Sequence, residues 1–399
     1  MRFVLTVTDG PNAGQNFAFA ERDNFIVGRS AAAHFQPDKK DRFFSRYHFL
    51  VEINPPLGRL IDLGSNNGTQ VNDKKVPRAD LKGGDKIRAG KTELTVRIEP
   101  DPADKAAGRA PEAAIAIDPD PTTAFAIPGH RVVGEIGRGG IGVVYLARAD
   151  RDGAQVAVKI ITPVAATTRR NIDRFVTDAG ALKQLVHPNV VAVRDVGVVA
   201  GRLYLTMDYF LGTDAGRLVK ERGPLPVPSA VRTAIEVLRA LEHAHSQNLV
   251  HRDIKPSNIL MRPDNKAHAI KLTDFGLARL YQSSPLSGLS RDAALGGTPA
   301  FLPPEQVTAH RTANPASDLF AVGATLYFLL TGKPIHDFDT DSRPPLALVL
   351  EGDPIPIRDR RSEIPEGLAT AIHRSLARDP AKRFGTSAEF VEALRAYRE

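Results

Sequence analysis

Residues 251–258 read His251-Arg252-Asp253-Ile254-Lys255-Pro256-Ser257-Asn258, and residues 274–276 read Asp274-Phe275-Gly276. Asp253 can accept a proton, and Lys255 supplies a positive charge two residues later. Asn258 and Asp274 carry the oxygen atoms that Mg²⁺ prefers as ligands. A proton acceptor, a cation and two metal ligands in this order indicate phosphoryl-transfer chemistry, which depends on alignment and charge neutralisation.

A glycine-rich segment precedes this set in the chain. Gly137, Gly139, Gly142 and Val144 fit the pattern G-x-G-x-x-G-x-V. Glycines allow backbone amides to approach a polyphosphate because no Cβ stands in the way. Strand patterns flank the segment on both sides, so we expect a flap over a nucleotide rather than a dinucleotide-binding turn that enters a helix. The alternative is an ordinary glycine-rich hairpin turn.

A strand with one buried-side lysine follows the glycine segment. Residues 155–160 alternate so that Ala157 and Lys159 share one face, while the valines and the isoleucine face a core. The small alanine leaves room for a base, and the ammonium group can meet phosphate oxygens. A surface lysine on an edge strand is the alternative, but the position about 20 residues after the glycine segment favours nucleotide binding.

In combination, these motifs resemble the eukaryotic-like (Hanks-type) Ser/Thr protein kinases of bacteria, and the resemblance covers residues 129–399. Short strand patterns up to about residue 160, followed by helical patterns, agree with an α+β fold of two lobes. The resemblance implies a bilobal kinase fold, with ATP as the phosphoryl donor and Mg²⁺ as the metal (Mn²⁺ being an alternative). It also implies that proteins with Ser or Thr hydroxyls are the substrates.

The resemblance further implies roles for single residues. Asp253 would accept the proton of the incoming hydroxyl, and Lys255 would stabilise the transferring phosphoryl group. Asn258 and Asp274 would hold the metal, and Lys159 would bind the α- and β-phosphates. These roles agree with a loose transition state that needs positioning and electrostatic stabilisation.

The adenine site and its supports are implied in the same way. Met207, Asp208 and Phe210 would form the hinge whose backbone groups hold adenine, next to Val144 and Ala157.

Several further residues are expected to be structural. Glu305 would pair with Arg383, Asp318 would brace the catalytic loop, and His251 is expected in a core. Arg252 would suit a phosphate on the activation segment because its guanidinium forms bidentate contacts.

One position departs from the kinase pattern. The partner of the strand lysine is normally glutamate, but Asp178 stands there. The spacing of Phe175, Asp178, Leu182 and Leu185 predicts that they share the inner face of one helix. Aspartate is one methylene shorter, so the helix would need to approach about 1.5 Å closer. We expect an active enzyme, with Asp178 as a catalytic support.

The segment between Asp274 and Glu305 offers four serines as phosphoacceptors: Ser283, Ser284, Ser287 and Ser290. Phosphorylation there could order the segment against Arg252. The alternative is that these serines simply keep a surface loop soluble.

Residues 1–99 show a different pattern, with short alternating segments and polar turns that predict an all-β sandwich. The predicted strands are residues 2–7, 24–27, 48–53, 60–63 and 92–98.

Three motifs in this region resemble the forkhead-associated (FHA) domain, which binds phosphothreonine peptides: residues 28–30, 45–48 and 63–72. The resemblance implies that Arg29 and Ser45 contact the phosphate, that Asn67 grips the peptide backbone, and that Arg46 adds positive charge. Asn66 stands where Thr or Ser is often found. A guanidinium, a hydroxyl and turn amides suit a phosphate chemically.

Gly28, His48 and Asn72 are expected to hold the loops of this domain in place rather than to bind a ligand.

Residues 100–128 are rich in Asp, Pro and Ala and predict a linker. Thr122 and Thr123 lie in this linker, and we hypothesise that one of them is phosphorylated and captured by the FHA domain of the same chain or of a neighbour. A featureless spacer is the alternative.

Composition limits the remaining classes. The chain has 399 residues, no cysteine and a net charge of +7 that is spread along its length, so disulfides are absent and a nucleic-acid-binding tract is not expected. No apolar run reaches membrane-spanning length and the first residues lack a signal-peptide core, so a cytoplasmic protein is expected. A catalytically silent scaffold that only binds phosphopeptides remains the alternative function.

Overall fold

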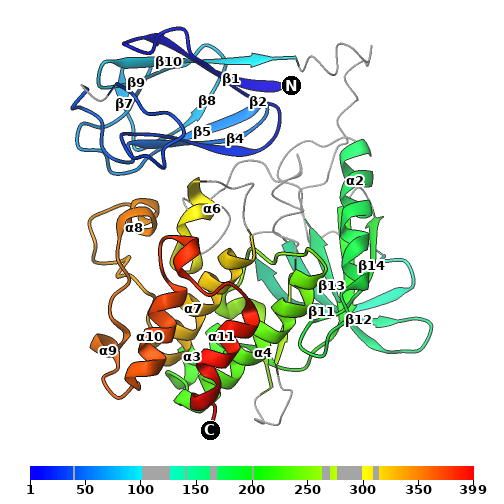
Figure 1. The fold of residues 1–399 in the computed structure, drawn as a ribbon. Coiled ribbons are helices and arrows are strands. Elements are labelled where there is room, and N and C mark those ends of the chain that lie inside the picture. The colour runs from blue at the N-terminus through cyan, green and yellow to red at the C-terminus, as the bar shows by residue number, and fades with distance from the viewer. Residues whose placement is uncertain are drawn as a thin grey trace.

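The computed structural model describes residues 1–38, 41–100, 126–139, 142–161, 169–199, 202–262, 270–275, 299–308 and 314–399. A β-sandwich formed by the N-terminal residues packs on a two-lobed C-terminal region (Figure 1). Within the described residues, no helix has both the length and the apolar composition that a membrane crossing requires.

The sandwich consists of two antiparallel sheets. The first has the order β2-β1-β10-β9-β6-β7, with bounds Asn16–Phe19, Arg2–Asp9, Thr92–Glu99, Lys86–Ala89, Gln70–Val71 and Lys74–Lys75. The second has the order β3-β4-β5-β8, with bounds Asp23–Val27, Phe49–Asn54, Leu57–Asp62 and Arg78–Leu81. Alternate residues of both sheets, such as Phe3, Leu5, Val51 and Leu94, form the core between them. The five predicted strands are confirmed to within three residues at each end.

In its described residues, the smaller lobe consists of a five-stranded antiparallel sheet and helix α2 (Arg169–Gly180). Its order is β11-β12-β13-β15-β14, with bounds His130–Gly139, Gly142–Ala149, Gln155–Ile161, Arg202–Asp208 and Val193–Val199. Helix α2 contacts β14, and the 3₁₀ turn η1 (Ala181–Gln184) follows it directly. One face of β13 is buried in a cluster with Tyr204 and the other in a cluster with Met207, as the alternation of this strand predicts.

The larger lobe is helical. Its helices are α3 (Ala215–Arg222), α4 (Val227–Ser246), α6 (Pro304–Thr308), α7 (Pro315–Thr331), α8 (Pro345–Glu351), α9 (Ile357–Arg360), α10 (Glu366–Ser375) and α11 (Ser387–Leu394). Its 3₁₀ turns are η2 (Pro256–Asn258), η4 (Pro299–Phe301), η6 (Pro380–Lys382) and η7 (Arg395–Tyr397). A small sheet, β16-β17-β18 (Thr213–Asp214, Ile259–Met261, Ile270–Leu272), lies at its edge.

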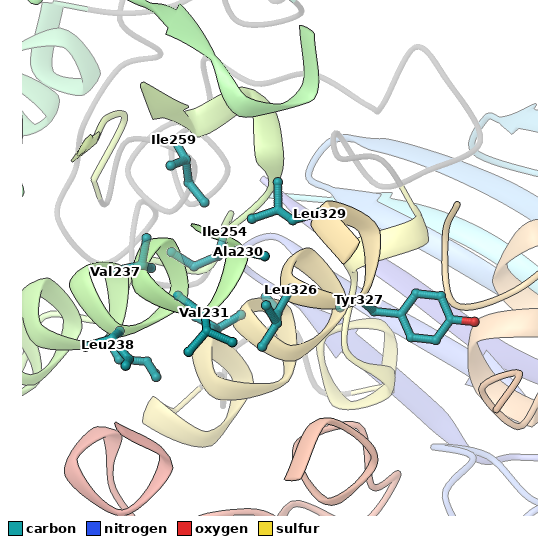
Figure 2. Packing of buried hydrophobic residues seen from close by; sticks show 14 of the residues in the cluster. Ala230, Val231, Val237, Leu238, Ile254, Ile259, Leu326, Tyr327 and Leu329 are labelled. Carbon is teal, nitrogen blue, oxygen red and sulfur yellow. The ribbon is translucent and has the colours of Figure 1, made fainter. Parts of the chain in front are cut away.

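Helices α4 and α7 form the centre of the larger lobe. Val231, Ile235, Leu238, Leu241 and Ala244 repeat at helical spacing along α4 and are buried, and α7 is apolar on nearly all sides, as expected for a core helix. Figure 2 shows Ile254, within the catalytic loop, and Ile259, directly after it, near Val237 of α4 and Leu329 of α7. The loop that carries the predicted catalytic residues therefore packs directly on the core of this lobe.

The sandwich contacts the larger lobe through the outer face of its second sheet. Ile26, Leu50 and Ile61 belong to a buried cluster that also contains Val307 of α6 and the apolar residues of α8. The side-chain amide of Asn24 donates a hydrogen bond of 3.2 Å to the backbone oxygen of Val307. Both faces of this sheet are thus buried, one by the sandwich core and one by the kinase-like region (Figure 1).

Candidate active site and phosphate-binding loops

The catalytic-loop residues are held by one buried carboxylate. Asp318, at the start of α7, accepts hydrogen bonds from the backbone amides of His251 (2.9 Å) and Arg252 (2.8 Å). Arg252 adopts a positive φ of 68°, a conformation that an L-residue holds only when its surroundings impose it. The expectation that Asp318 braces this loop is confirmed, and so is the buried position of His251, which is fully enclosed.

Asp253, Lys255 and Asn258 lie within hydrogen-bonding distance of one another. The ammonium group of Lys255 is 2.9 Å from Oδ2 of Asp253. The amide of Asn258 donates to the backbone oxygen of Asp253 (2.7 Å) and to its Oδ2 (3.1 Å). The amide nitrogen of Asn258 is therefore occupied inside the loop, which leaves its side-chain oxygen for a cation.

Lys159 and Asp274 connect the two lobes. The ammonium group of Lys159, on β13, donates a hydrogen bond of 2.7 Å to Oδ2 of Asp274, which lies just after β18. Burial by itself raises the pKa of Asp274, but the charge and hydrogen bond of Lys159, with the charges of His251 and Lys255, hold the pKa below its ordinary value. Asp274 is therefore an ionised carboxylate in a largely buried position.

Apolar residues gather next to Lys159. Val144, Ala157 and Met207 contact one hydrophobic cluster, as the hinge and strand motifs predict. Leu260 of β17 joins the same cluster from the larger lobe and is a residue that the motif reading missed. Leu260 is half-buried between two buried neighbours in a three-residue strand.

The three glycines of the predicted flap are not equivalent. A Cβ on Gly142 would lie 1.9 Å from the backbone oxygen of Ile160, so glycine is required there by the close approach of β12 and β13. A Cβ on Gly139 would meet nothing within 4 Å, and one on Gly137 would touch only Val144. The open space beside Gly137 and Gly139 is what a phosphate-binding flap needs.

The hinge side chains already have partners. Oδ1 of Asp208 accepts a hydrogen bond from Arg194 at 2.7 Å, and Arg262 lies over the ring of Phe210 at 5.2 Å. Any adenine contact at Asp208 and Phe210 would therefore be made by the backbone, as expected.

Asp178 differs from its expected position. The side chain is exposed, whereas Ile172 and Ala179 are the buried residues described on α2, so the prediction that Asp178 shares an inner face with Leu182 and Leu185 is wrong. The helix ends at Gly180 and continues as a 3₁₀ turn, whose tighter winding rotates the later leucines relative to the helix. The structure brings Lys159 to Asp274.

The expected pairing of Glu305 with Arg383 is confirmed. The guanidinium donates two bonds to the carboxylate, of 2.6 and 2.8 Å, and is completely buried. The neighbouring Gln306 was missed: its side-chain amide donates to the backbone oxygen of Arg252 at 3.3 Å. Helix α6 therefore touches the catalytic loop on one side and the sandwich on the other.

Some predicted residues lie outside the described residues: Phe175 (for its side chain), Gly276, the four serines of the activation segment, and Thr122 and Thr123 of the linker.

The predicted phosphate-binding residues lie on neighbouring loops of the sandwich. Oγ of Ser45 accepts a hydrogen bond from the backbone amide of Asn66 at 3.1 Å, and the side-chain amide of Asn67 donates to the backbone oxygen of Phe43 at 2.8 Å. The Nε of Arg29 donates to the backbone oxygen of Phe44. Arg29, Asn66 and Asn67 are exposed, so their remaining donors face solvent.

The supporting residues of these loops behave as predicted. The ring of His48 accepts from the backbone amide of Ser45 (3.1 Å) and lies 3.3 Å from the backbone oxygen of Gly68, so it joins the two loops. Burial lowers the pKa of His48. A Cβ on Gly28 would lie 2.2 Å from the backbone oxygen of Arg46. The side-chain amide of Asn72 donates a hydrogen bond to the carboxylate of Asp85, and its oxygen accepts one from the backbone amide of Lys86.

Asp62 was missed by the motif reading. Its carboxylate accepts hydrogen bonds from the amide and hydroxyl of Ser65 (2.8 and 2.7 Å) and from the hydroxyl of Thr69 (2.7 Å). It shapes the loop that carries Asn66 and Asn67.

Arg46 points to the larger lobe. Its guanidinium forms an ion pair of 2.8 Å with Glu351 at the end of α8.

Family models agree with the two regions. Residues 130–394 match the protein kinase domain, and residues 25–90 match the FHA domain. Curated relatives include the serine/threonine-protein kinase PknK of Mycobacterium tuberculosis, 36% identical over 266 residues, which are 66% of this chain and 23% of PknK. The kinase pkn3 of Myxococcus xanthus is 34% identical over 273 residues, 67% of this chain and 49% of pkn3. The chain thus spans a quarter to a half of the length of these relatives.

Solved structures agree at the level of the fold. The kinase domain of Mycobacterium tuberculosis PknI is 26% identical, with a TM-score of 0.53, and the match covers 71% of this chain and 100% of that chain. Rad53 1–466 in complex with AMP-PNP is 22% identical, with a TM-score of 0.55 and complete coverage of both chains.

Proposed function

This chain belongs to the protein kinase family, and from that membership we propose that it transfers the γ-phosphoryl group of ATP to Ser or Thr hydroxyls of protein substrates. We propose further that its FHA domain recruits partners that carry phosphothreonine. The observation that carries the first proposal is the convergence of Asp253, Lys255 and Asn258 within about one hydrogen bond of each other.

The donor set fits a nucleotide with Mg²⁺. Asn258 and Asp274 offer oxygen atoms, and Lys159 keeps Asp274 ionised despite its burial. Asn258 and Asp274 would hold the metal, which would supply positive charge to neutralise the phosphates. The apolar cluster at Val144 and Ala157 suits the face of a base.

The protein residues then divide the work of the reaction. Asp253 accepts the proton from the attacking hydroxyl, and its carboxylate is oriented by the amide of Asn258. Lys255, 2.9 Å away, carries positive charge to the phosphoryl group while it leaves ATP. Lys159 orients the non-transferred phosphates, and the glycine flap excludes water above them.

The test is incubation with [γ-³²P]ATP and a mixture of Ser and Thr peptides. We expect Asp253→Asn to lower labelling by at least about 10²-fold, because removal of a general base costs about 10²- to 10⁴-fold. Arg29→Ala should retain labelling of an unphosphorylated peptide and lose binding of phosphothreonine peptides. Equal labelling by the wild type and Asp253→Asn would favour the silent scaffold instead.

A further inference from the structure

Both predicted phosphate-binding loops of the sandwich contact the same kinase helix. Arg46, in the first loop, forms its ion pair with Glu351 at the C-terminal end of α8. Gly64, at the start of the second loop, approaches the N-terminal end of α8, since a Cβ built on it would lie 2.6 Å from Cδ of Pro344. The two loops are joined by the hydrogen bond between Ser45 and Asn66. The kinase domain therefore forms one wall beside the phosphopeptide site.

The side chain of Arg46 is free to change partners while its backbone stays in place. The backbone oxygen accepts a hydrogen bond of 2.9 Å from the amide of Ser30. The side chain is 69% exposed even in the ion pair with Glu351. Exposed pairs are weak, whereas a phosphate carries nearly two charges and accepts bidentate bonds from a guanidinium.

The other arginines near the α8 carboxylate have acidic partners of their own. Arg343 pairs with Asp341 at 2.6 Å, and Arg378 pairs with Asp353 at 3.1 Å. In the described part of the chain, the ion pair of the α8 carboxylate is therefore with Arg46.

We propose that Glu351, a residue of the kinase domain, is a specificity-determining residue of the FHA phosphopeptide site. Its carboxylate competes with the incoming phosphate for Arg46 and repels the phosphate itself. The site consequently rejects weakly charged ligands and selects those whose phosphate makes the full set of contacts. This inference rests on the proposed phosphothreonine recognition by Arg29 and Ser45.

The competition works in both directions. If Glu351 weakens phosphopeptide binding, a bound phosphopeptide must weaken the contact of Arg46 with Glu351 by the same factor. The interface also contains an apolar cluster with residues such as Leu50 and Leu350, and the hydrogen bond from Asn24 to Val307, so the sandwich stays on α8 when the ion pair is exchanged.

The experiment compares the full-length wild type with Glu351→Gln, by fluorescence anisotropy of a phosphothreonine peptide selected from a randomised library. We expect Glu351→Gln to bind about three- to fivefold more tightly at low salt, the size of an exposed ion pair. The gain should shrink at about 0.5 M salt because of screening. Asp353→Asn is the matched control: it removes the same charge two residues away, from a side chain paired with Arg378 and not with the sandwich. It should leave the affinity unchanged.

The double variant Arg46→Ala/Glu351→Gln tests whether the charge of Glu351 acts on the phosphopeptide through Arg46. If the charge acts through Arg46, Glu351→Gln gains no affinity once Arg46 is absent. A phosphopeptide that binds the wild type and Glu351→Gln equally, or a gain that persists without Arg46, overturns the inference. If no library peptide binds the wild type better than Arg29→Ala does, phosphothreonine recognition itself fails, and the inference falls with it.

Discussion

At the scale of single residues, the ion pair between Lys159 and Asp274 joins a strand of one lobe to the end of a strand in the other. The pair is 2.7 Å long and largely buried, so it is weakly screened by salt. It places a cation and the carboxylate that we propose as a metal ligand at the same point, which is where a metal-chelated triphosphate would need both.

Asp178 is the residue whose substitution is most informative for turnover. We expect Asp178→Glu to preserve kcat, because the side chain at position 178 is exposed and the structure pairs Lys159 with Asp274. Steady-state kinetics with a Ser or Thr peptide measures this. A collapse of activity would show that turnover depends on the length of the carboxylate at position 178.

His336 makes stability depend on pH. Burial lowers the pKa of His336 to about 4, from 6.5. As pH falls from 6.5 towards 4, the unfolded chain binds a proton that the folded protein excludes, so the free energy of unfolding decreases by up to about 1.4 kcal/mol per pH unit. Above pH 6.5 this contribution is complete.

The variant His336→Gln should remove this contribution to the pH dependence of the free energy of unfolding. Between pH 6.5 and 5, we expect the free energy of unfolding of the wild type to fall by roughly 1–2 kcal/mol more than that of the variant, as measured by urea denaturation. Parallel pH profiles for the two proteins would show that His336 titrates normally.

The chemistry of single residues could be predicted where it is local in sequence. Asp253, Lys255 and Asn258 lie within six residues, so their spacing alone brings them together. Asp178 was misplaced because the helical repeat was continued past Gly180, where the helix actually ends. Gln306 was missed because its partner is a backbone atom of the catalytic loop, 54 residues away in the chain, and such a contact leaves no trace in a motif. Asp62 was missed although its partners, Ser65 and Thr69, lie in the loop that follows it.

At the scale of elements, the hairpin of β11 and β12 contains glycines with two different roles: Gly142 allows close packing against β13, and Gly139 leaves space open for a ligand. We expect Gly142→Ala to reduce the free energy of unfolding of the smaller lobe by about 1–3 kcal/mol, the cost of overpacking, because the new Cβ would lie 1.9 Å from the oxygen of Ile160. Thermal denaturation with and without nucleotide measures the change.

Gly139→Ala is the matched control within the same hairpin. Its Cβ meets open space, so stability should be unchanged while the KM for ATP rises, since the methyl group obstructs the approach of a phosphate. Equal effects of both variants on stability would contradict the distinction between them.

The elements themselves followed their hydrophobic periodicity. Strands such as β1 and β10 have regular alternation and were predicted close to their observed bounds. The two-residue strands β6 and β7 were not, because two residues carry no period and their pairing is set by neighbours in the sheet.

At the scale of the whole molecule, the sandwich and the larger lobe share one buried cluster. Leu50 is completely buried in it, whereas Leu57, in the next strand, is 40% exposed. We expect Leu50→Asp to separate the two domains, because it loses the burial of a leucine, worth about 1.5–3 kcal/mol, and places a carboxylate against α8. Small-angle scattering and limited proteolysis measure the separation.

Leu57→Asp is the control for that substitution. The same change at an exposed position should leave scattering and proteolysis as in the wild type. A compact Leu50→Asp protein would show that the domains are held together by other contacts.

The domain contact could not be predicted from the sequence. Ile26, Leu50 and Ile61 are apolar, as the core positions of the same strands are, so both faces of the sheet look alike in sequence. The periodicity of apolar residues indicates which side chains are buried, but not which part of the molecule buries them.

Helix α6 has only five residues, and it bonds to Arg252 through Gln306 and to Asn24 through Val307. An exchange of this sandwich for a different phosphopeptide reader would thus strip the cover from α6 and α8, and a chimera would have to inherit the apolar outer face of β3 and β4 together with its new ligand loops. In any mutational survey scored by phosphorylation alone, positions 24, 26 and 50 should register as enzyme residues, although they lie some two hundred positions ahead of Asp253.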